Sequence, residues 1–104
     1  MKFTKINNNG VKCDEGFVVQ SMDRNEMEYR EGDRRLKVYV ENWSAAPVGR
    51  WSKPGEYGID FMLSRAEHWE PPHDNELISE EKREQIKKRL IAAMNFWGYK
   101  YNFS

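Results

Sequence analysis

Polar and apolar residues alternate along much of the first two thirds of the chain, which predicts β-strands rather than helices. The four expected strands are GFVVQSM at 16–22, EMEYR at 26–30, RLKVYVE at 35–41 and EYGIDFML at 56–63. The first is rich in β-favouring residues, and each of the others places its apolar residues on one face. This pattern is typical of antiparallel strands with a single buried face. The short loop Glu31-Gly32-Asp33 joins the second and third strands, which predicts a β-hairpin.

The pattern changes to a helical period in the last third of the chain. Apolar residues of the predicted helix recur on one face at Ile86, Leu90, Ala93, Met94 and Trp97. Ser79 is placed to cap the start of this helix and Gly98 to end it. The segment YKYNF at 99–103 alternates again and predicts a last strand. The predicted fold is therefore α+β: an antiparallel β-sheet meander packed against one long C-terminal helix, with a short final strand, in a single domain spanning 1–104.

Charge and composition narrow the possible classes of function. Seventeen basic and 17 acidic residues give a formal net charge of zero, which argues against a dedicated nucleic-acid or membrane-surface binder. The single cysteine, Cys13, excludes an internal disulfide framework and favours a reducing compartment. The first residues lack the apolar core of a secretory signal, and the longest apolar run, LIAAM at 90–94, is too short to span a membrane. We therefore expect a soluble, cytoplasmic protein.

A long segment at 41–56, ENWSAAPVGRWSKPGE, has no clear period and carries two tryptophans. One interpretation is a surface loop whose Trp43 and Trp51 fold back onto the core. The alternative is a recognition loop, because tryptophan and arginine dominate the energetics of protein interfaces and functional residues collect on loops. Arg50 and Trp51 are neighbours in the sequence and suit a partner contact better than Trp43.

Both histidines of the chain lie in HWEPPHDNE at 68–76, which raises the question of a metal site. His68 and His73 are five residues apart with two prolines between them, so they do not share a helix face as a zinc-binding pair does. The H-x-E arrangement at 68–70 is also found in zinc deaminases, but their signature requires a P-C-x-x-C pair, which this sequence lacks. An oxygen-ligand site remains an alternative, built from Glu70, Asp74 and Glu76.

The same segment also contains the residue types needed for acid–base chemistry. A histidine beside a carboxylate suits a general base, and the candidates are His68 or His73 with Asp74. The sequence contains no nucleophile elbow and no glycine-rich phosphate loop to accompany such a base. We therefore expect no catalytic residue, no bound metal and no cofactor.

Charge is the clearest property of this part of the chain. From Glu67 to Glu81 there are six acidic residues and no Lys or Arg. They form either a solvated loop that leads into a capped helix, or a surface complementary to a basic partner. The double proline is expected to hold the backbone extended. The candidate partner-binding residues are Glu67, Glu70, Asp74, Glu76, Arg50 and Trp51.

The stretch Trp69-Glu70-Pro71-Pro72, followed by Asp74, Glu76, Ile78, an acidic helix start and Ile86, resembles small immunity proteins of bacterial polymorphic-toxin and contact-dependent growth inhibition systems. The resemblance covers residues 57–103, about half the chain. It implies a non-enzymatic inhibitor that binds the C-terminal domain of a toxin stoichiometrically. Many such toxins are nucleases with basic clefts. The resemblance also implies that Trp69 anchors its segment in the core. Because toxin contacts differ from partner to partner, it transfers no binding site.

Two other functions stay open from the sequence. A nucleic-acid-binding module would use exposed aromatic residues with Arg34, Arg35 and Lys37, or the helix cations between 82 and 89. A metal-dependent enzyme would centre on His68, Glu70, His73 and Asp74. The expected partner remains a toxin domain, with no nucleic acid and no membrane. The oligomeric state is open, because an exposed strand edge is available for pairing.

Overall fold

The computed structural model describes residues 1–44 and 57–103. In chain order its elements are β1 (Phe3–Asn7), β2 (Gly10–Cys13), β3 (Phe17–Asp23), β4 (Glu26–Glu31), β5 (Arg34–Ser44), β6 (Tyr57–Phe61), the 3-10 turn η1 (Leu63–Arg65), α1 (Glu80–Trp97) and β7 (Lys100–Phe103). All the described strands belong to one sheet in which spatial order follows chain order from β1 to β7. This arrangement confirms the predicted α+β fold, and the segment with Arg50 and Trp51 lies outside the described residues.

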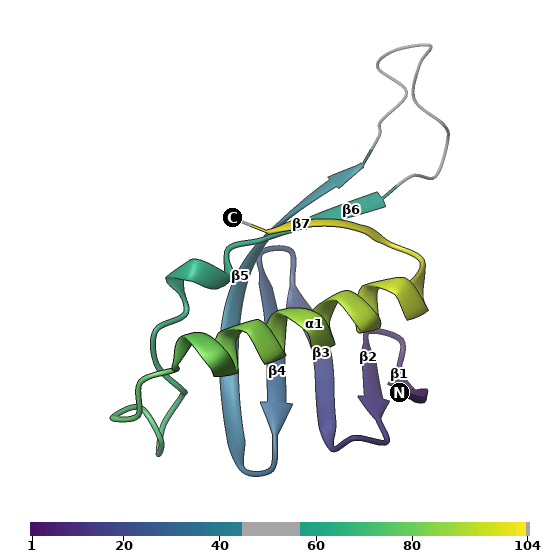
Figure 1. Cartoon of the computed structure of the whole chain (residues 1–104). Helices are drawn as coiled ribbons and strands as arrows, with labels where there is room; N and C mark the ends of the chain where they lie inside the picture. Colours follow the sequence, from purple (N-terminus) through teal and green to yellow (C-terminus); the bar gives the residue numbers. More distant parts are fainter. Residues whose placement is uncertain (45–56, 104) are drawn as a thin grey trace.

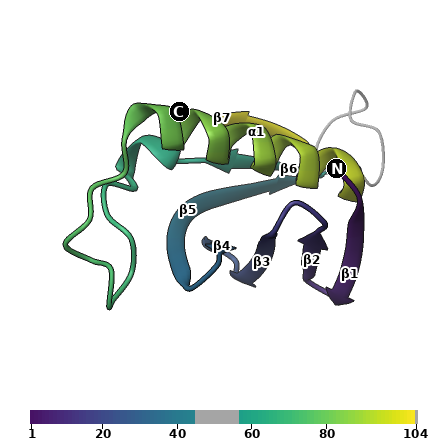
Figure 2. The same ribbon diagram turned by 60° about the horizontal axis from the view of Figure 1, so that its bottom comes forward.

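The sheet curls around one face of α1, so that the helix lies across the concave side (Figures 1 and 2). The long strand β5 makes this curl possible because it pairs with two different neighbours. Its first part, from Arg34 to Tyr39, pairs with β4, and its second part, from Val40 to Ser44, pairs with β6. Figure 2 shows β5 sweeping from the layer of β1–β4 up to the layer that holds β6 and β7.

The core lies between α1 and the concave face of the sheet. Met27, Tyr29, Leu36 and Val38 are at most 2% exposed, so the alternation read from the sequence correctly assigns the buried face of the hairpin. On the helix the predicted stripe is buried at Ile86, Leu90, Ala93 and Met94, and Trp97 packs partly buried against the same cluster. Burial of this kind is the main favourable contribution to folding.

Both predicted helix caps are present. The Ser79 hydroxyl accepts a hydrogen bond from the backbone N–H of Lys82 at 3.1 Å, which satisfies one of the free donors of the first turn. Gly98 ends the helix with φ 81°, a left-handed conformation that glycine adopts without the steric cost of a side chain.

A polar network ties α1 to the sheet beside this core. The Tyr29 hydroxyl donates to the Glu31 carboxylate at 2.8 Å and accepts from Arg89 at 2.6 Å. Lys82 donates to the same carboxylate at 3.0 Å. Burial and the neighbouring carboxylate raise the pKa of Tyr29 well above its ordinary value, although the hydrogen bond from Arg89 acts in the opposite direction. Two of the helix cations therefore serve the fold.

The structure differs from the sequence prediction at both edges of the sheet. The strands β1 and β2 precede the first predicted strand, and the prediction missed both. The residues of β1 are exposed or half-buried and show no alternation of burial, and β2 is only four residues long. At the other edge β7 pairs with β6 in parallel, because the chain crosses over through α1 before it returns to the sheet. The strand predicted at 56–63 ends at Phe61 and continues into η1.

Candidate protein-binding surface

The loop between η1 and α1, residues 66–78, is built around Trp69. This side chain is 5% exposed and lies 6.4 Å from the ring of Tyr29 between centroids. The backbone around it is fixed as well: the N–H of Glu70 donates to the carbonyl of Arg35 at 2.8 Å. An isolated bridge pairs His68 with Leu77 at the base of the loop. The anchoring role that the resemblance implied for Trp69 agrees with this burial.

The double proline does not hold the chain extended, so that expectation is wrong. The carbonyl of Glu70 accepts from the N–H of His73 at 3.0 Å, which reverses the chain across Pro71 and Pro72. A second turn follows, in which the carbonyl of His73 accepts from the N–H of Glu76 at 3.0 Å. Prolines have no N–H to donate, so the residues that flank them make the turn bonds. The loop therefore consists of consecutive turns and protrudes from the molecule beside the start of α1 (Figure 1).

Two of the candidate binding residues are engaged in ion pairs within the chain. Arg34 holds the Glu76 carboxylate through two hydrogen bonds of 2.8 and 3.0 Å, and this contact lowers the pKa of Glu76. Glu70 lies 3.6 Å from the ammonium of Lys37. The acidic run from 67 to 81 is therefore partly neutralised by cations of β5.

His73 adds a further link between this loop and the β4–β5 turn. Its Nε2 lies 3.0 Å from a carboxylate oxygen of Asp33, and this hydrogen bond is the main cause of the lowered pKa of Asp33. Its Nδ1 lies 3.8 Å from Glu76. The candidate general base is thus held by carboxylates, and no nucleophilic side chain is among these partners.

Other carboxylates of the same region have no such partner among the described residues. The side chains of Glu67 and Asp74 make no ion pair or hydrogen bond with residues 1–44 or 57–103. The same holds for Glu80, Glu81 and Glu84 at the start of α1. An open hollow of ≈ 500 Å³ lies beside these three, lined also by Gln85 and Lys88.

Leu77 lies where the loop meets these acids and is 72% exposed. It is the most exposed large hydrophobic residue of the described chain. We define the loop–helix surface as Glu67, Asp74, Leu77, Glu80, Glu81 and Glu84. The structure thus leaves Glu67 and Asp74 of the sequence candidates free for a partner. Leu77 is not among the residues predicted from the sequence, although an apolar residue between Glu76 and the polar start of the helix is a signal visible there.

The comparison with known families decides the class of protein. The family model of Immunity protein 74 matches residues 18–104. The chain belongs to this family. The match confirms the resemblance to immunity proteins of toxin systems and covers β3 to β7 with α1. No curated protein and no solved structure matches the chain.

Membership of the Immunity protein 74 family supports a toxin-neutralising role with a protein toxin as the partner. It also suggests an inhibitor rather than an enzyme. Within the described residues, no helix is both long and apolar enough to cross a membrane.

The cations proposed for nucleic-acid binding are mostly engaged within the immunity protein. Arg34 and Lys37 pair with acids as described above, and the guanidinium of Arg35 lies 3.4 Å from the carbonyl oxygen of Pro71. On the helix, Arg83 donates to the carbonyl of Ala66 at 2.8 Å. These contacts engage Arg34, Arg35, Lys37 and Arg83 within the chain, where they help to anchor the loop.

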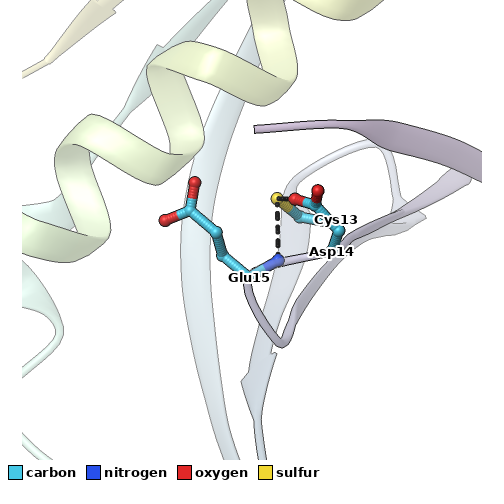
Figure 3. Close-up of side chains that lie close together, drawn as sticks. All are labelled: Cys13, Asp14 and Glu15. Atoms are coloured by element: carbon cyan, nitrogen blue, oxygen red, sulfur yellow. Dashed lines mark hydrogen bonds between the residues drawn. The ribbon is translucent and has the colours of Figure 1, made fainter.

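The residues proposed for a metal enzyme do not converge into a site. Among the residues that the structure describes, one group of three side chains has potential ligand atoms close together: Cys13, Asp14 and Glu15 (Figure 3). The Cys13 sulfur lies 3.5 Å from an Asp14 oxygen and accepts from the N–H of Glu15 at 3.5 Å. The same Asp14 oxygen accepts from the N–H of Lys2 at 3.0 Å, which lowers the pKa of Asp14. These hydrogen bonds belong to the turn that follows β2, and the geometry of this turn explains why the three side chains lie close together.

Proposed function

We propose that this chain neutralises its toxin by binding it stoichiometrically, without turnover, through the loop–helix surface. The observation that carries the proposal is the exposure of Leu77 in a segment, 67–84, several of whose carboxylates have no ion pair or hydrogen bond among the described residues. An apolar anchor surrounded by charge is a common arrangement at protein interfaces, where the anchor supplies affinity and the charges steer association. The partner that fits this surface is a basic one.

A basic partner surface is what a nuclease toxin presents around its substrate cleft, so the proposal includes a nuclease as the toxin class. We further propose that the toxin is the C-terminal domain of a polymorphic or contact-dependent inhibition protein, and that the chain acts in the cytoplasm. Arg50 and Trp51 remain proposed contacts that lie outside the described residues. Glu70 and Glu76 are secondary candidates, because their carboxylates already bind Lys37 and Arg34.

Co-expression with the C-terminal domain encoded by the upstream gene tests the proposal directly. We expect rescue of growth and a stable one-to-one complex. The double variant Glu67→Lys/Asp74→Lys should weaken the complex and reduce or reverse the fall of its affinity with added salt, while its thermal unfolding stays near that of the parent. Retained wild-type affinity in this variant would move the interface away from the loop–helix surface.

A control makes the same charge change at two acids of the same loop that are half-buried and paired with cations. Glu70→Lys/Glu76→Lys also adds four units of positive charge to the loop, but it breaks the pairs with Lys37 and Arg34. We expect this control to lower stability as well as affinity. A loss of affinity without a loss of stability occurs only in the first double variant if the proposal is right.

A further inference from the structure

The strand β1 is an outer strand of the sheet. Among the residues that the structure describes, it pairs with β2 alone, so one of its sides has no strand partner there. The other outer strand, β7, lies alongside α1, whose Lys87 is placed over the Phe103 ring at 5.4 Å. Figure 2 shows β1 at the free end of the curl, below the C-terminal end of the helix. An unpaired strand edge presents backbone donors and acceptors that another chain can use.

The register shows which backbone groups of β1 face outward. The N–H of Asp14 donates to the carbonyl of Lys2 at 3.0 Å, so these two residues form a hydrogen-bonded pair. Hydrogen-bonded and non-hydrogen-bonded pairs alternate along an antiparallel ladder. Thr4 is therefore bonded to Lys12, and the N–H and C=O groups of Phe3 and Lys5 point away from β2.

Side chains beside this edge provide a surface for a bound strand. Phe96 of α1 is 45% exposed, and its ring lies 5.4 Å from that of Phe3 between centroids. Phe3 and Lys5 share the face of Cys13 and Val11, their register partners, which is the concave face. A strand added to β1 would extend the curl toward the helix end and cover the exposed part of Phe96.

Charge determines which kind of strand fits. Lys5 and Lys12 make no ion pair with any residue that the structure describes. A second copy of the chain does not satisfy Lys5, because the β1 sequence FTKIN contains no carboxylate. Self-pairing centred on Lys5 would place two lysines opposite each other, which is destabilising.

We infer that the outer edge of β1 binds an extended segment of the toxin that carries a carboxylate opposite Lys5 and an apolar residue against Phe3 and Phe96. This inference rests on the proposed function and adds a contact at the other end of α1 from the loop–helix surface. The family match begins at residue 18, so β1 and β2 lie outside the matched part. The edge is therefore suited to a contact that is particular to this chain and its toxin.

The test compares two substitutions at one position in the complex with the upstream toxin domain. Lys5→Ala removes the charge and keeps the outward N–H, whereas Lys5→Pro removes both. Proline is tolerated on an outer strand where its missing N–H faces solvent. We expect Lys5→Ala to weaken binding by about threefold and to lower its salt dependence. Lys5→Pro should weaken binding by about a further tenfold, with unfolding curves near the parental one.

Amide hydrogen exchange on the unmodified chain gives a second test that needs no variant. The amides of Phe3 and Lys5 should gain protection when the toxin binds, while the Thr4 amide, already bonded to β2, should change little. Unchanged exchange at Phe3 and Lys5, or equal affinity of the two Lys5 variants, overturns the inference and leaves the proposed function intact. Absence of any complex with the parent chain overturns both. Self-association of the chain alone that Lys5→Pro abolishes would assign the edge to a second copy instead.

Discussion

Trp69 and Leu77 are large apolar residues of the same loop, and they differ most clearly in their exposure to solvent. Trp69 is 5% exposed and Leu77 is 72% exposed. An aromatic side chain buries roughly 150–250 Å². At about 25 cal/mol per Å², burial of a tryptophan contributes at most roughly 4–6 kcal/mol to the free energy of folding. Truncation of buried tryptophans costs about 3–5 kcal/mol. We therefore expect Trp69→Ala to lower the free energy of unfolding by about 4 kcal/mol.

Chemical denaturation and thermal unfolding measure this difference. For a domain near this size each kcal/mol corresponds to about 4 °C or more, so Trp69→Ala should lower Tm by about 15 °C. Leu77→Ala is the matched control and should stay within about 0.5 kcal/mol of the parent. In the toxin-binding assay we expect Leu77→Ala to have a clear effect despite its small effect on unfolding. Leu77→Ala should weaken the complex by about tenfold, because an exposed residue that becomes buried in an interface contributes there.

Two results would refute this reasoning separately. A loss below about 1 kcal/mol in Trp69→Ala would show that Trp69 does not anchor the loop. Unchanged toxin affinity in Leu77→Ala, in a complex that otherwise forms, would remove Leu77 from the interface while the burial argument for Trp69 stands.

Two further predictions concern the polar contacts. Glu31→Ala removes the carboxylate that Lys82, Arg89 and the buried Tyr29 share. It should lower the free energy of unfolding, measured with denaturant, by about 2 kcal/mol. The control Glu84→Ala, whose carboxylate has no partner among the described residues, should lower it by less than about 0.5 kcal/mol. The pKa values of Asp33 and Glu76 are lowered in the folded chain, so their contribution is complete above about pH 5 and is lost as pH falls through their folded pKa values. Unfolding measured from pH 6 to pH 2 should show a smaller acid loss in Asp33→Asn/Glu76→Gln than in the parent.

Local patterns in the sequence predicted the parts of the fold that depend on local periodicity. Met27 and Tyr29 alternate with polar residues because one face of their strand is buried, and periodicity reports burial. Ser79 and Gly98 were predicted as caps because a cap acts on its own helix turn. The strand β1 was missed for the same physical reason, since its residues are exposed or half-buried on both faces and no period marks an unburied strand.

The acidic run could be located from the sequence, but the ion pairs that its carboxylates make could not. Arg34 and Glu76 are 42 residues apart and meet only because the loop packs against β5. The acidic run looked free of cations because local sequence cannot show which side chains of another strand lie beside it. The free acids Glu67 and Asp74 could be separated from the engaged Glu70 and Glu76 only from the folded chain.

The division of the loop into acids that are paired within the chain and acids that are not affects how tightly such a small chain can bind. Binding costs more free energy when a loop must become ordered as it binds. Here the engaged half of the loop does that ordering in advance: Trp69 enters the core, and Arg34 clamps Glu76 through two hydrogen bonds. The unpaired half, with Leu77 and the free acids, is then presented from a fixed frame. Arg34 lies outside the loop–helix surface, yet loss of its clamp should weaken toxin binding through a faster dissociation rate. An unchanged dissociation rate in Arg34→Met would show that this ordering of the loop does not matter for binding.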